Sequence, residues 1–133
     1  VLGRGGGALV KMLPAFKMFA GGPMGTGSQW MPWIHIDDLV SAVHYLVDHQ
    51  QARGAYNFCA PYPVRNHELA ATLAKVLKRP SALPVPAFLL RTALGDLSET
   101  FLDSQRVVPE RLTAEGFAFD YPKLAAALTH LVG

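Results

Sequence analysis

Residues 29–38 read QWMPWIHIDD and join an extended, apolar segment directly to the start of a helix. The aromatic and β-branched side chains favour an extended backbone, whereas Asp37 or Asp38 can cap the helix that follows. From residue 39 to residue 47, apolar side chains recur at helical spacing, which predicts an amphipathic helix. A strand followed by such a helix is typical of α/β proteins, in which the apolar helix face lies on a sheet.

Glycine-rich sequence precedes this unit. Residues 21–28 read GGPMGTGS and predict a long loop, and long loops within compact domains are often functional. Further upstream, the glycines at 5–7 predict a turn that leads into a helix at residues 8–13, which Pro14 kinks or divides. The first residues predict the end of a strand.

The sequence after the amphipathic helix predicts more helices than strands. We expect a strand at 55–59 and a helix that starts near Asn66 and stops at Pro80. A proline-rich linker at 82–86 is followed by these predicted elements: helices at 88–94 and 96–102, an extended piece at 106–108, a helix from Pro109 to Gly116, strand-like alternation at Phe117 and Phe119, and a last helix from Pro122. The chain therefore supplies little sheet on which the helix at 39–47 can lie.

Composition excludes several classes of protein. The 133 residues are 50% hydrophobic and 17% charged, which predicts a folded domain with one core. The net charge of +2 comes from scattered residues, so we expect no nucleic-acid partner. No apolar run approaches the ~20 residues of a membrane span, so we expect no membrane partner either. The single cysteine, Cys59, forms no internal disulfide and favours a reducing, cytoplasmic location, with its side chain a buried hydrophobe rather than a nucleophile.

The order of these motifs resembles a specific family, the epimerase-like proteins of the extended short-chain dehydrogenase superfamily that end in a small domain of unknown function. Some members carry a cell-division-inhibitor label. The resemblance covers essentially the whole chain and rests on these stretches: VLGRGGGAL at 1–9, GGP at 21–23 with Gly25 and Gly27, QW at 29–30, WIHIDDL at 33–39, YNF at 56–58, PVRN at 63–66, PVP at 84–86, QRV at 105–107, Pro109, and Gly116 with Phe117 and Phe119.

The resemblance implies an α/β fold class, the carboxyl-terminal part of an extended Rossmann-type dehydrogenase, with mostly helices, a few short strands and no dinucleotide-binding sheet. It implies two parts: residues 1–80 form the substrate-binding, lid half, and residues 81–133 form a small helical domain. The parent protein is expected to use NAD(P) and a small-molecule substrate as an epimerase or oxidoreductase. An amino-terminal dinucleotide-binding domain is expected to precede the residues seen here.

Two features of the family's chemistry are absent from the sequence. No G-x-x-G-x-x-G turn, which holds a pyrophosphate at a helix start, follows a complete strand. None of the four tyrosines is followed four residues later by lysine, so the acid–base pair that the resemblance predicts is missing. We therefore expect no catalytic residues, no cofactor bound by this chain alone and no activity by itself. The alternative is a stand-alone binding or assembly module that forms a homodimer through exposed apolar helix faces.

Several polar and aromatic residues remain candidates for a site. Leu2 and Gly3 resemble the segment that passes near the nicotinamide, so they are the candidate cofactor contacts, and an ordinary strand end is the alternative. Gln29, Trp30 and Trp33 flank the glycine-rich loop, where they either contact substrate or pack in the core.

His35 and Arg65 complete the predicted substrate contacts. His35 precedes two aspartates, but a structural histidine with helix caps explains this pattern better than a metal site, so no metal is expected. Arg65 and Asn66 either line the pocket or cap a helix. Related nucleotide-sugar epimerases often place an arginine where this chain has Met31 and Pro32, and that departure weakens the case for a diphosphate-bearing sugar substrate.

Overall fold

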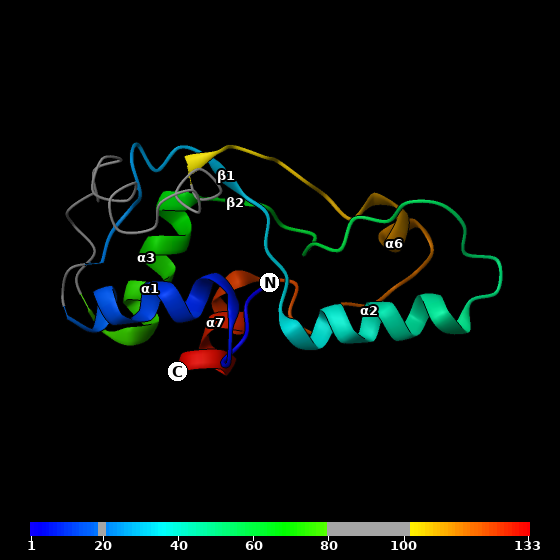
Figure 1. The fold of residues 1–133 in the computed structure, drawn as a ribbon, viewed down its shortest axis with the longest axis horizontal. Coiled ribbons are helices and arrows are strands. Elements are labelled where there is room, and N and C mark those ends of the chain that lie inside the picture. Colours follow the sequence, from blue (N-terminus) through cyan, green and yellow to red (C-terminus); the bar gives the residue numbers. More distant parts are fainter. Residues whose placement is uncertain (19–20, 80–101) are drawn as a thin grey trace.

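A computed structural model describes residues 1–18, 21–79 and 102–133 (Figure 1). Its helices and strands, in chain order, are α1 (Gly7–Lys17), β1 (Trp30–Met31), α2 (Ile36–Asp48), β2 (Val64–Arg65), α3 (Asn66–Leu77), α6 (Glu110–Ala114) and α7 (Leu124–Val132). The described part is thus mostly helical with two short strands, as predicted. The linker at 82–86 and most of the two helices predicted at 88–102 lie outside the described residues.

The hydrophobic core lies among α1, α3 and α7, which gather at one end of the molecule (Figure 1). Each helix contributes one apolar face at helical spacing, because residues three and four apart share a face. The buried side chains of these faces are Leu9, Met12 and Phe16 from α1, Leu69 and Leu73 from α3, and Leu124, Leu128 and Leu131 from α7. Since α7 packs against α3, residues on both sides of position 80 share this core.

Helix α1 continues through Pro14, where the sequence predicted a kink or a division. Proline lacks the N–H that would donate to the carbonyl of Val10, one turn earlier. Val10 lies on the exposed side of the helix, so water can take the place of that donor. The apolar contacts of Met12 and Phe16 on the opposite side hold the two halves of the helix against the core.

The only sheet in the described part pairs β1 with β2 in antiparallel register, with Trp30 opposite Arg65 and Met31 opposite Val64. Strand β2 lies between the strand predicted at 55–59 and the helix predicted from Asn66, where no strand was expected. The strand predicted at 55–59 is wrong, and neither the extended piece predicted at 106–108 nor the alternation at 117–119 belongs to a strand. A strand exists only when a neighbour pairs with its backbone, and no described segment pairs with these.

Helix α2 extends away from the helical core toward the other end of the molecule, where α6 and the segments around it lie (Figure 1). The Tyr45 hydroxyl donates to the Glu115 carbonyl, and the Tyr45 ring meets the Phe117 ring edge to face. Phe117 meets Phe119 in the same way, so this alternation reflects aromatic packing rather than a strand. Helix α6 ends before Gly116, as the sequence predicted.

The amino-terminal segment crosses the start of α2. The Leu2 backbone donates to the Ile34 carbonyl at 2.8 Å and accepts from the Ile36 N–H at 2.9 Å, which forms a parallel bridge to His35. Leu2 thus behaves as the strand end that the sequence predicted. None of the described helices combines the length and apolar character that crossing a bilayer requires.

Candidate functional site

The glycine-rich loop at 21–28 is fastened to the start of α3. The Asn66 side chain is completely buried, and its Oδ1 atom accepts the Met24 N–H at 2.6 Å. The His67 N–H donates to the Gly27 carbonyl at 2.9 Å. Gly27 has a φ of +72°, a backbone conformation that glycine adopts without strain. These contacts place the end of the loop, and hence β1, at a fixed position.

The sequence suggested that Asn66 could cap α3. It does not, because its side-chain oxygen already accepts a hydrogen bond from the loop. The helix begins instead after Arg65, whose backbone N–H donates to Glu68 Oε2 at 2.9 Å. A glutamate at the third helical position that accepts the backbone N–H of the capping residue is one half of a capping box. The Arg65 side chain is thereby left to face β1.

Trp30 and Arg65, two of the predicted substrate contacts, meet on the surface of the β1–β2 sheet. The Arg65 guanidinium lies 4.7 Å from the centre of the Trp30 ring, and Arg106 lies over the same ring at 5.5 Å. The Trp30 N–H donates to the Ser104 hydroxyl at 3.0 Å, and the Gln105 N–H donates to the Trp30 carbonyl at 3.2 Å. These backbone bonds bring Arg106 to Trp30. The sequence motifs did not single out Arg106 as a site residue, because its contacts come from a segment more than seventy positions away.

Gln29 and Trp33 occupy the interior instead. The Gln29 side chain is 7% exposed and its Nε2 atom donates to the Met24 carbonyl at 3.0 Å. Trp33 is 3% exposed, and its ring N–H donates to the Tyr62 carbonyl at 3.2 Å. In both cases the polar group is used to join backbone segments, which is the core-packing alternative that the sequence left open.

His35 is completely buried, and both of its ring nitrogens are engaged. Its Nδ1 atom accepts the Asp37 N–H at 3.0 Å, which makes His35 the residue that caps α2. With a proton then assigned to Nε2, the ring donates to His130 Nδ1 at 2.9 Å. Tyr121 stacks on the His35 ring at 4.0 Å. Burial lowers the pKa of His35, and the carboxylate of Asp37 opposes that effect.

Asp38 is also fully buried and serves a second junction. Its Oδ1 atom accepts the Asp120 N–H at 2.8 Å, and its Oδ2 atom accepts the Tyr121 N–H at 2.9 Å. The sequence treated Asp37 and Asp38 as equivalent helix caps. The structure distinguishes them, because only Asp38 holds the segment that leads into α7.

His35, Asp37 and His130 bring potential metal-ligand atoms within 4.8 Å of one another. The arrangement does not fit a bound cation, because both ring nitrogens of His35 are already in use. The lone pair of Nδ1 accepts a backbone N–H, and Nε2 is hydrogen-bonded to His130. The cluster is better explained as the junction between the start of α2 and the end of α7.

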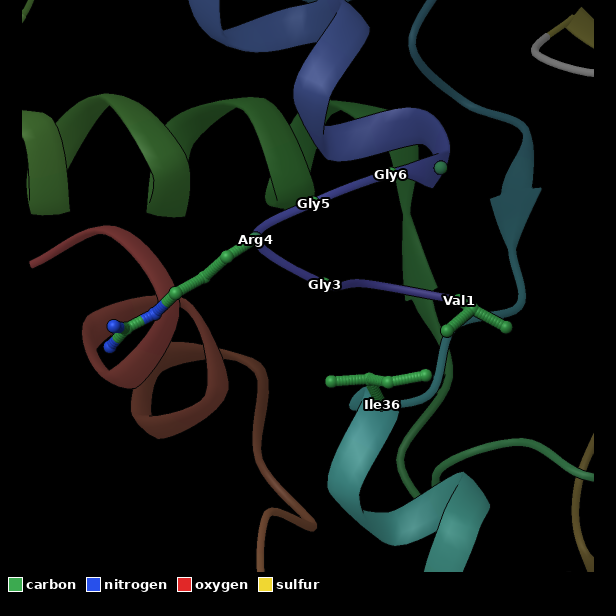
Figure 2. A pocket seen from close by; sticks show the side chains of 7 residues that line it. Val1, Gly3, Arg4, Gly5, Gly6 and Ile36 are labelled. Atoms are coloured by element: carbon green, nitrogen blue, oxygen red, sulfur yellow. The ribbon is translucent and has the colours of Figure 1, made fainter.

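Leu2 and Gly3, the predicted cofactor contacts, are both buried, but only Gly3 lines a pocket. This pocket of about 410 Å³ is also lined by Val1, Arg4, the glycines at 5–7 and Ile36. Figure 2 shows Val1 and Ile36 beside this pocket, while the Arg4 side chain extends away toward α7, where it donates to the His130 carbonyl. The pocket wall is therefore mainly backbone and apolar side chain.

Cys59 lies in the interior, and burial raises the pKa of its thiol. A thiol with a raised pKa is a poor nucleophile, since the thiolate is the reactive form.

Two family models and several known proteins match this chain in sequence. The model of the "NAD dependent epimerase/dehydratase family" matches residues 12–59, and that of a "Domain of unknown function (DUF1731)" matches residues 85–131. The chain matches the epimerase family. It is 47% identical to the chloroplastic epimerase family protein SDR39U1 homolog of Arabidopsis thaliana, over 96% of this chain and 37% of that protein. An epimerase family protein of Staphylococcus haemolyticus is 44% identical, over 99% of this chain and 44% of that protein.

Solved structures of the epimerase family agree with this match. The human epimerase family protein SDR39U1 (isoform 2), solved with NADPH, superposes with a TM-score of 0.92 at 37% identity, over 98% of this chain and 44% of the human chain. A nucleoside-diphosphate sugar epimerase from Corynebacterium glutamicum gives a TM-score of 0.70 at 32% identity, over 99% of this chain and 24% of that one. The predicted family resemblance and fold class are confirmed. The chain spans about two fifths of the length of the curated relatives named here.

Proposed function

We propose that this chain forms the substrate-side part of an NAD(P)-dependent epimerase or oxidoreductase, and that sequence outside it supplies the dinucleotide site and the catalytic acid–base pair. Residues 1–80 are the substrate-binding part and residues 81–133 the small terminal part; the two family matches lie on either side of this boundary and support it. The absence of a Tyr-x-x-x-Lys pair and of a G-x-x-G-x-x-G turn supports the incomplete chemistry.

The observation that carries this proposal is the exposed apolar face of α2. Val40, Val43 and Val47 are 48%, 46% and 75% exposed, although their spacing predicts a buried helix face. Phe58 is also exposed and, with Val43 and Val47, lines a groove of about 410 Å³. The groove wall at 55–58 is the segment predicted as a strand, and no described segment pairs with it. A sheet would cover the apolar face of α2 and pair with the extended segment at 55–58. Both features are therefore expected in a chain from which that sheet is missing.

The structure of the human relative contains NADPH, which supports NAD(P) as the cofactor of the whole protein. In this chain we assign Gly3, in the pocket of Figure 2, as the closest candidate to the nicotinamide, with Leu2 holding it in place through backbone bonds to residues 34 and 36. Trp30 and Arg65 are the candidate substrate contacts. Gln29, Trp33 and His35 support them through the interior contacts described above. The proposed location is the cytoplasm.

The test is association in trans. We would co-express this chain with the part of the Staphylococcus haemolyticus relative that precedes the matched region, and measure complex formation by size-exclusion chromatography with light scattering. Val43→Asp is expected to abolish the complex because a carboxylate would be buried against apolar surface. Val10→Asp is the matched control, since Val10 is a valine of similar exposure, 40%, on a different helix.

The same apolar face also favours the alternative function, a module that assembles with a second copy of itself. In that case the chain alone would be a stable dimer, Val43→Asp would convert it to a monomer, and the dinucleotide-binding part would not bind. A monomeric chain that binds the added part through Val43 supports the proposed function. A dimeric chain that does not bind the added part supports the alternative function instead.

A further inference from the structure

Side chains from the terminal part hold the extended segment 55–58, which forms one wall of the groove beside α2. Arg111 Nη1 donates to the Ala55 carbonyl at 2.8 Å, and the Arg111 guanidinium lies over the Tyr56 ring, 4.1 Å from its centre. The Tyr56 hydroxyl accepts from Arg111 Nη2 at 3.4 Å and donates to Glu115 Oε1 at 2.6 Å. One residue of α6 and the residue that follows α6 thus contact both the backbone and a side chain of this segment.

Gly54 leaves room for this arginine. Its φ is +78°, and a Cβ atom at this position would lie 3.1 Å from Arg111 Nη1. Any other residue would be strained here and would crowd the guanidinium, because glycine adopts a positive φ without a steric penalty. The turn at Gly54 therefore allows Arg111 to reach the carbonyl of the next residue, where the extended segment begins.

Glu115 also connects this segment to α2. Its backbone carbonyl accepts the Tyr45 hydroxyl at 2.6 Å, while its side chain accepts the Tyr56 hydroxyl. Leu112, on α6, is fully buried, which anchors this short helix in the fold. The terminal part thus holds α2 and segment 55–58, the two features that a sheet outside this chain would contact, relative to each other.

The segment itself offers backbone groups for pairing. Between the Ala55 carbonyl and the Ala60 N–H, which donates to the Trp33 carbonyl, no backbone group bonds to any described residue. Ordering such a segment costs conformational entropy, which weakens binding when the partner strand has to impose the order. Contacts that hold the backbone extended before the partner arrives remove part of that cost.

We propose that Arg111 and Glu115 are positioning residues, through which the terminal part holds segment 55–58 extended for pairing with a strand of the dinucleotide-binding part. The partner is a strand that offers backbone N–H and carbonyl groups at its edge, and Phe58 adds an apolar contact in the groove. This inference rests on the proposed function. It assigns to the terminal part a role in the assembly of the whole protein that does not involve the substrate.

The first measurement is ¹⁵N relaxation by nuclear magnetic resonance on the isolated 133-residue chain. Backbone order parameters near roughly 0.85, typical of rigid structure, are expected for residues 55–58. Arg111→Gln should lower them below about 0.6, because the segment loses the bond to the Ala55 carbonyl and the stacking on Tyr56. Residues 64 and 65 of β2 are the internal reference and should keep their values.

The second measurement is the strength of the complex with the preceding part of the Staphylococcus haemolyticus relative, purified after co-expression and diluted before size-exclusion chromatography. We expect Arg111→Gln to raise the dissociation constant about tenfold. Arg106→Gln is the matched control, because Arg106 also belongs to the terminal part and lies over an aromatic ring, that of Trp30 at 5.5 Å. It should leave the dissociation constant unchanged, since Trp30 belongs to β1 and not to the groove.

A pair of substitutions at Glu115 separates positioning from a general effect on α6. Glu115→Gln keeps a side-chain oxygen that accepts the Tyr56 hydroxyl, so it should preserve both the order parameters and the complex. Glu115→Ala removes the acceptor and should weaken the complex. Arg111 and Glu115 are exposed, so the circular dichroism melting curves of these variants should match that of the unaltered chain.

Unchanged order parameters or an unchanged dissociation constant in Arg111→Gln would overturn the positioning role while the proposed function stands. Equal weakening by Arg106→Gln would overturn it too, because the loss would then be a general effect of charge. If Arg111→Gln lowers the melting temperature, the Glu115 pair decides, and equal behaviour of its two variants overturns the role. If the unaltered chain forms no complex, both the positioning role and the proposed function fail.

Discussion

Replacement of Asp38 by asparagine tests the junction that connects α2 to the segment before α7. The carboxylate is completely buried and accepts two backbone N–H groups, from Asp120 and Tyr121, one on each oxygen. In Asp38→Asn, one oxygen becomes an NH₂ group that faces a backbone donor. One charge-assisted hydrogen bond, worth about 1.5–3 kcal/mol, is lost, and two buried donors then oppose each other.

We therefore expect Asp38→Asn to lower the free energy of unfolding by about 2–4 kcal/mol, a large part of the ~5–15 kcal/mol typical of a folded domain. Asp37→Asn is the matched control, because it makes the same chemical change one residue earlier on a side chain that is 58% exposed. Its cost in free energy of unfolding should stay near roughly 0.3–1 kcal/mol, which is what a charge in the first helical turn contributes to stability.

Urea unfolding at pH 7, followed by circular dichroism, measures both effects through the transition midpoint at constant slope. Equal destabilisation by the two substitutions would contradict a special role for Asp38, because it would mean that both aspartates act only as charges at the start of α2. A loss below about 0.5 kcal/mol for Asp38→Asn would refute it as well, since surface substitutions have effects of that size.

Burial and backbone geometry also determine how the protein responds to pH, to a core truncation and to a glycine substitution. Burial lowers the pKa of His35 in the folded state, so the unfolded chain binds more protons. Stability should therefore fall as the pH drops from about 6.5 toward that lowered pKa, by at most ~1.4 kcal/mol per pH unit, and His35→Gln should flatten this slope in urea titrations. Leu128→Ala removes a fully buried side chain of α7 and should cost about 2–5 kcal/mol in the same unfolding assay, and a smaller cost would show that α7 does not belong to the core. Gly27→Ala forces a side chain into a positive φ, with its Cβ 3.0 Å from Pro23, so it should lower the melting temperature measurably, whereas Gly5→Ala, with open space around it, should not.

The sequence predicted the elements that local patterns determine. Helices α2, α3 and α7 have regular apolar spacing, and each was expected close to its observed bounds. The family resemblance was readable as well, because it depends on the order of short motifs along the chain. The prediction for α1 was wrong at Pro14. The helix tolerates this proline because the carbonyl that loses its backbone donor is exposed to water.

Contacts between distant segments were not predictable from local patterns. Asp38 pairs with a backbone 82 positions later, and Arg106 meets Trp30 across a similar separation. Strand β2 exists because β1 lies beside it, while the equally strand-like residues 55–59 have no such neighbour in the described part. Residue types indicate what a side chain can do, but the partner that uses it is fixed only by the fold.

Titration of the purified 133-residue protein with NADPH, followed through nicotinamide fluorescence, shows whether the dinucleotide site lies outside this chain. We expect no saturable binding at low micromolar concentrations. A dissociation constant below about 1 µM, equivalent to roughly 8 kcal/mol of binding free energy, would contradict it, because the pocket beside Gly3 alone would then hold the cofactor.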